Sequence, residues 1–96
     1  MPNCFQLTRK GETQPSSLVK IDEEICGLVG QPVDARHYCF GWFDIIGFPL
    51  ACGKSYSDIR QQFMEDGFEN TFPEILTILG YLEENYTPKA WYEPKR

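Results

Sequence analysis

The chain has 96 residues, of which 42% are hydrophobic, 24% charged and 15% aromatic, a balance typical of one small folded domain and not of a disordered segment. Its net charge is −5, and its nine basic residues are scattered, which argues against direct binding of nucleic acid. No leader opens the sequence, and no apolar run reaches the roughly 20 residues of a membrane-spanning helix. We therefore expect a cytoplasmic protein without membrane association, a single domain over residues 1–96, with four cysteines as free thiols.

Alternating residues predict a short strand near the N-terminus, over residues 4–10, "CFQLTRK". Phe5 and Leu7 would face the core, whereas the residues between them would face solvent. A loop rich in turn residues, "GETQPSS", follows the strand. Residues 18–21, "LVKI", are expected to return as the second strand of a hairpin.

A helix is predicted over about residues 22–29, with Asp22 as its N-cap and Gly30 at its end. The start of this helix has an alternative. Four apolar residues share one helical face from residue 18 onward, so "LVKI" is also compatible with the first turn of a longer helix. The members of that face are Leu18, Ile21, Ile25 and Leu28.

The most apolar stretch, "YCFGWFDIIGFPLACG", spans residues 38–53 and contains one charge, Asp44. We expect a buried central helix over residues 35–48, capped by Asp34 and kinked or ended near Pro49. Val33 and Tyr38 would form a hydrophobic staple at its start. A strand is the alternative, although two glycines and the proline weaken it. Asp44 would either be paired in the core or reach solvent.

Two further helices follow. Ser55 and Asp58 are spaced as a capping box, and the helix they begin should stop at Gly67. Thr71 is expected to cap the last helix, which should end near residue 85. The predicted fold class is α+β and mainly helical, with an N-terminal strand or hairpin packed with about four helices.

Candidate chemistry is sparse, and we expect no metal, no cofactor and no enzymatic activity. The possible soft ligands form neither a C-x-x-C nor an H-x-x-x-H pair, and the chain has no glycine-rich phosphate loop. These ligands are Cys4, Cys26, His37, Cys39 and Cys52. The alternative is a small enzyme or metal-binding protein that uses His37, Asp44 and nearby cysteines.

Two features favour binding of a protein partner. Residues 86–96 form a C-terminal tail with prolines and aromatics, which is either docked on the domain or held for recognition. The preceding helix carries an acidic outer edge. The candidate partner-binding residues are Tyr86, Trp91, Tyr92, Glu83 and Glu84, and a second copy of the chain, in a homodimer, is one partner considered.

Three segments carry a resemblance. "CFQLTRKGE", "GWFDIIGF" with "GKSYSDIRQQF", and "YLEENYTPKAWY" resemble small uncharacterised proteins of phages and prophages. The resemblance implies no activity and no functional residues. It implies action in a bacterial cytoplasm on a host or phage protein. The expected function is therefore a small non-enzymatic protein-binding module, as an accessory phage factor.

Overall fold

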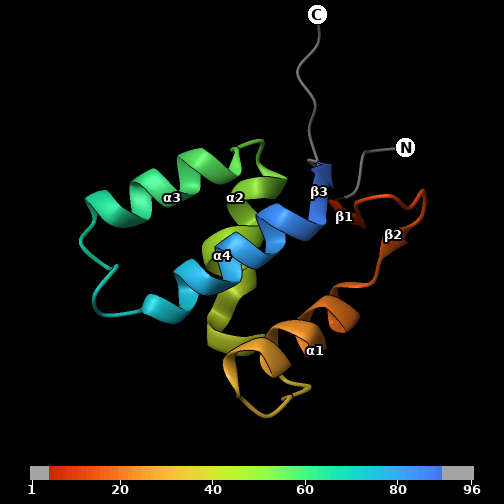
Figure 1. Cartoon of the computed structure of the whole chain (residues 1–96), viewed down its shortest axis with the longest axis horizontal. Coiled ribbons are helices and arrows are strands. Elements are labelled where there is room, and N and C mark those ends of the chain that lie inside the picture. Colours follow the sequence, from red (N-terminus) through yellow and green to blue (C-terminus); the bar gives the residue numbers. More distant parts are fainter. Residues whose placement is uncertain (1–4, 90–96) are drawn as a thin grey trace, which may run out of the picture.

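Helices dominate the chain, and a small sheet joins its two ends (Figure 1). The computed structural model describes residues 5–89. In order, the elements are β1 (Gln6–Arg9), β2 (Pro15–Ser16), α1 (Leu18–Val29), a 3₁₀ turn (Cys39–Gly41), a π-helix (Phe43–Gly47), α2 (Phe48–Ala51), α3 (Tyr56–Glu65), α4 (Pro73–Asn85) and β3 (Tyr86–Lys89). The predicted class, a mainly helical α+β fold with an N-terminal hairpin, is confirmed.

The sheet has the strand order β2-β1-β3, and both pairs are antiparallel. The hairpin partner of β1 is Pro15–Ser16 and not residues 18–21 as predicted. On its other side β1 pairs with β3, where Leu7 lies opposite Pro88. A proline is tolerated in such an edge strand, because an edge residue need not donate to the ladder. The first residues of the expected tail are thus part of the fold.

Helix α1 begins at Leu18, four residues earlier than predicted. The Ser17 side chain accepts a hydrogen bond from the backbone N–H of Lys20 at 3.0 Å and caps the helix. Asp22 is therefore not an N-cap but lies inside the helix, where it is buried. The predicted end is confirmed, since Gly30 has a left-handed backbone with φ 75° and its N–H donates to the Cys26 carbonyl.

The predicted helix over residues 35–48 is right only in its second half. The Asp34 carboxylate accepts the backbone N–H of Arg36 at 2.9 Å and makes a turn there instead of a helix cap. Val33 is exposed, so the predicted staple is not formed. Phe40 and Gly41, inside the 3₁₀ turn, then adopt positive φ angles of 54° and 63°, so the backbone is not helical there.

The π-helix and α2 form one continuous helical run that passes through Pro49. Its geometry depends on Gly47, because a Cβ atom there would lie 2.6 Å from the Phe43 ring. Trp42, Ile46 and Leu50 point into the core, but the outer side of the run is exposed, which corrects the expectation of burial all round. Its exposed residues include Asp44, Ile45 and Phe48.

Helices α3 and α4 follow their sequence signals more closely. Ser55 and Asp58 form the predicted capping box of α3, and Gly67, with φ 78°, follows its end. Helix α4 ends at Asn85 as expected, but Phe72 and not Thr71 occupies its N-cap position, and no side chain caps it.

The core lies between all these elements, and α4 contacts both α1 and α3. In Figure 1, α4 crosses in front of the π-helix and α2, with α1 and α3 on opposite sides. Fully buried side chains come from the sheet and from every longer helix except α3, whose two inward residues, Ile59 and Phe63, are buried but keep a few per cent of exposure. The largest of them are Trp42, Tyr86, Leu7, Ile21, Ile25, Ile46, Leu50, Ile75, Ile78, Leu79 and Leu82.

Candidate functional site

An apolar groove opens beside α3, with a volume of about 500 Å³. We call it the α2–α3 groove. Its lining comes from the π-helix, α2, α3 and the turns that flank α3. The lining residues are Ile45, Pro49, Lys54, Asp58, Ile59, Gln61, Gln62, Phe63, Glu65, Asp66, Phe68 and Phe72.

Large apolar side chains in this groove remain open to solvent. Ile45 is 38% exposed, Phe68 is 43% exposed and Phe72 is 45% exposed. The rings of Phe63, Phe68 and Phe72 form a row, with centroids 5.8 Å apart at each step. A small domain that leaves several large apolar side chains side by side in a concavity has a surface suited to a partner.

Local backbone structure holds the aromatic row in place. The left-handed Gly67 turns the chain after α3, and the N–H of Phe68 donates back to the Phe63 carbonyl at 3.3 Å. The N–H of Phe72 then donates to the Phe68 carbonyl at 2.8 Å. These bonds place Phe68 and Phe72 in a turn and not on a helical stripe, so both rings face the groove.

The groove carries more negative than positive charge. Its lining contains three carboxylates, on Asp58, Glu65 and Asp66, and one ammonium, on Lys54. Within residues 5–89, no ion pair involves any of these four groups. Two glutamines instead donate to the acids along α3, Gln61 to Glu65 at 3.1 Å and Gln62 to Asp66 at 3.0 Å.

A second notable group is the buried carboxylate of Asp22, on α1. Its Oδ1 accepts the backbone N–H of Cys39 at 2.8 Å and the indole Nε1–H of Trp42 at 2.9 Å. Its Oδ2 lies 3.8 Å from the Cys26 thiol, which donates to it. Burial, with the neighbouring Cys39 and Asp22, raises the pKa of Cys26 to about 12, so the thiol stays protonated. Through these hydrogen bonds Asp22 joins α1 to the 3₁₀ turn and to Trp42.

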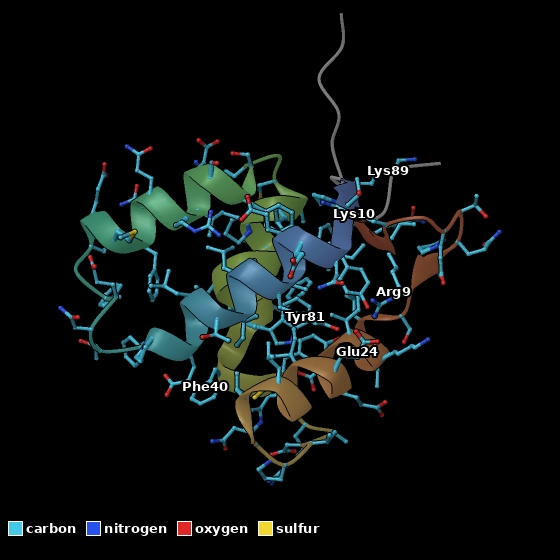
Figure 2. The ribbon with its side chains drawn as sticks, in the orientation of Figure 1. Arg9, Lys10, Glu24, Phe40, Tyr81 and Lys89 are labelled. Carbon is cyan, nitrogen blue, oxygen red and sulfur yellow. The ribbon has the colours of Figure 1, made fainter. Side chains whose placement is uncertain are left out.

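A third group surrounds Glu24, where α1, α4 and both long strands meet (Figure 2). Its Oε1 accepts hydrogen bonds from Arg9, Tyr81 and Tyr86, each at 2.7 Å. The Arg9 guanidinium also lies over the Tyr86 ring, 4.8 Å from the centroid. Burial acts to raise the pKa of Glu24, but the three hydrogen bonds outweigh it and hold the pKa below its usual value. A carboxylate kept ionised and occupied in this way is a poor general base.

The residues of the alternative enzyme or metal hypothesis take up different environments. His37 is exposed in a turn, with Nδ1 3.6 Å from an Asp34 oxygen. Asp44 is exposed on the π-helix, so of its two expected environments it has the solvent-reaching one. Cys26 and Cys39 are buried free thiols, whereas Cys52 is exposed. Among residues 5–89 no three His, Cys, Asp or Glu side chains gather as a metal would require.

The expected partner-binding residues are also dispersed. Tyr86 is fully buried, so its ring is not available to a partner. Its backbone carbonyl accepts a hydrogen bond from the Tyr56 hydroxyl at 3.0 Å. Glu83 pairs with Arg60 at 2.6 Å, and Glu84 is exposed on α4. Trp91 and Tyr92 lie outside the described residues.

Sequence reasoning missed the α2–α3 groove. The predicted last helix, with its cap at Thr71, includes Phe72, and no prediction concerned Phe68. One signal was present, namely two phenylalanines four residues apart in a turn-rich segment, "DGFENTFP".

Comparison with protein-family models, with curated proteins and with solved structures gives no significant match. Over residues 5–89, no helix combines the length and the apolar character needed to cross a membrane.

Proposed function

We propose that this protein is a small non-enzymatic protein-binding module and that the α2–α3 groove is its binding surface. The observation that carries the proposal is the exposed row of Phe68 and Phe72 beside Ile45, in a concavity of about 500 Å³. Aromatic and aliphatic side chains left open in a pocket are typical anchor points of protein interfaces.

The chemistry of the lining favours binding over catalysis. Among the described residues, no histidine, cysteine, serine, threonine or tyrosine lines the groove, so the candidate nucleophiles and bases there are limited to the carboxylates and the Lys54 amine. The two inward carboxylates of the fold, Asp22 and Glu24, are occupied by hydrogen bonds away from the groove. His37, Asp44 and the cysteines of the competing hypothesis are absent from the lining as well.

The setting we propose is a bacterial cytoplasm, with a host or phage protein as the partner. Its support is the resemblance of three sequence segments to small phage and prophage proteins. The acidic net charge of −5 is consistent with a partner that is a protein and not a nucleic acid.

Affinity capture with matched variants tests the proposal. The wild-type chain, immobilised in bacterial lysate, should retain a protein in stoichiometric amount. The double variant Phe68→Ser/Phe72→Ser should lose it, while Val19→Ser/Leu28→Ser, which changes two exposed apolar residues of α1, should keep it. Circular dichroism melts establish that each variant is folded. Equal capture by both variants would contradict the assignment to the groove.

A further inference from the structure

We infer that the occupant of the α2–α3 groove is an amphipathic α-helix of a partner protein, with apolar anchors on one face and lysine or arginine along the flanks. This inference rests on the proposed binding function and names the chemistry of the partner.

The secondary structure of the lining favours a helix as occupant. Every lining residue lies on a helix or in a connecting segment, and none belongs to a strand, so the groove offers no strand edge for an added peptide strand. A helix satisfies its own backbone hydrogen bonds and needs only an apolar surface for one face. The exposed rings of Phe68 and Phe72, in a row with the buried Phe63, and the exposed Ile45 of the same groove supply such a surface.

The charges of the lining favour basic flanks. Three carboxylates against one ammonium leave a net charge of −2 around an apolar floor. Within the described residues, none of the three carboxylates, on Asp58, Glu65 and Asp66, forms an ion pair with a cationic side chain. A lysine or arginine brought to this edge would gain charge-assisted hydrogen bonds and would steer the encounter.

The same charges disfavour a second copy of the chain. A symmetric dimer through this groove would join the same patch of both copies, so each copy would bring the same net charge of −2 to the interface. The two negatively charged patches would then repel one another.

Two synthetic peptides of about 18 residues, long enough to form helices, provide the probe. Both carry the same leucine and phenylalanine face, but one has lysine and arginine on its flanks and the other has glutamate. Binding is measured by fluorescence anisotropy. The wild-type chain should bind the basic peptide about tenfold more tightly than the acidic one, and raising the salt from about 0.05 M to about 0.5 M should narrow the difference.

Matched charge reversals locate the effect. Glu65→Lys/Asp66→Lys, at the groove, should abolish or reverse the preference between the peptides. Glu12→Lys/Glu23→Lys alters the net charge equally at two exposed positions outside the groove lining and should leave the preference intact. Phe68→Ser/Phe72→Ser should abolish binding of the basic peptide.

The outcomes separate this inference from the proposed function. Equal binding of both peptides, lost in Phe68→Ser/Phe72→Ser, would overturn the basic partner and leave the binding groove in place. Failure of both peptides to bind would overturn the helical occupant, and the lysate capture then decides the proposed function separately. Self-association in ultracentrifugation that disappears in the same variant would make a second copy the occupant and would overturn the inference.

Discussion

At the scale of single residues, Asp22 connects the first helix to the most apolar part of the chain. It is 3% exposed, and its Oδ1 accepts both the Cys39 amide and the Trp42 indole. A carboxylate among apolar side chains is stable only when such donors surround it. Asp44 is the one charge in the most apolar stretch of the sequence, but it is exposed. The buried Asp22 is the acid that forms hydrogen bonds with that stretch.

Substitution of Asp22 should therefore affect stability strongly. Asp22→Ala would leave the buried N–H groups of Cys39 and Trp42 without acceptors, and we expect a loss of about 3 kcal/mol in the free energy of unfolding. Asp22→Asn keeps one oxygen that can accept from both donors, so we expect its free energy of unfolding to fall by only about 1 kcal/mol. Urea unfolding, followed by circular dichroism, measures both free energies. Equal small losses would contradict a structural role for the carboxylate.

At the scale of elements, the π-helix over Phe43–Gly47 decides which side chains face the groove. Trp42, directly before it, and Ile46, inside it, are fully buried, whereas Ile45 is exposed and lines the groove. Such turns are uncommon and often occur where a helix carries a function.

Gly47 should be required for this turn. Gly47→Ala would bring a Cβ to 2.6 Å from the Phe43 ring, and we expect about 1–3 kcal/mol of destabilisation as the ring is displaced. Gly80→Ala is the matched control, since a Cβ there meets nothing within 4 Å and alanine is the better helix former. Thermal melts should show a lower Tm for the first and an equal or higher Tm for the second. A Gly47→Ala protein as stable as wild type would contradict the tight packing.

Element boundaries were predictable where the signal is local. The capping box of Ser55 and Asp58, and the left-handed Gly30, specify helix ends through atoms only a few residues apart. The start of the apolar segment was not predictable, because Cys39 and Trp42 bond to Asp22, about 20 residues earlier in the chain. Tertiary contacts of this kind override the helical pattern that the apolar residues display.

The groove was unpredictable for a related reason. Phe72 fits the periodicity of the last helix, yet its N–H bonds to Phe68 and keeps it outside the stripe. Periodicity identifies residues able to share a face, but the turn before the helix decides which of them are buried.

At the scale of the whole molecule, the Glu24 cluster and β3 hold the two ends of the chain together. Arg9 comes from β1, Tyr81 from α4 and Tyr86 from β3, and all three donate to the same carboxylate oxygen. The cluster is therefore a contact between segments as far as 77 residues apart, the separation of Arg9 and Tyr86.

The pH dependence of stability should report this cluster. The pKa of Glu24 is lowered in the folded state, so its contribution is present above its ordinary pKa of about 4.3 and is lost as the pH falls through the lowered value. For the wild type, the urea concentration at the unfolding midpoint should fall as the pH decreases through this range. For Glu24→Gln it should fall less steeply. Glu23→Gln, at the exposed neighbouring position, should keep the wild-type slope. Identical slopes in all three proteins would contradict the role of Glu24.

Strand β3 should be necessary for full stability. A chain ending at Asn85 loses the pairing with β1 and the buried ring of Tyr86, and its Tm should fall by more than about 10 °C. A chain ending at Lys89 retains both and serves as the control. It also tests whether the tail is docked or held for recognition, because a tail that docks through Trp91 on the domain or on a second copy requires this chain to melt below the full-length protein.

The central claim is that a partner protein binds in the α2–α3 groove, and site-specific photo-crosslinking tests it most directly. A photoreactive phenylalanine analogue replaces Phe68 in the groove or, as the control, Val19, which is 60% exposed on α1 and outside the lining. Irradiation in bacterial cells should join a protein to the chain labelled at position 68 and not to the chain labelled at position 19. The same adduct from position 19, with none from position 68, would contradict the account.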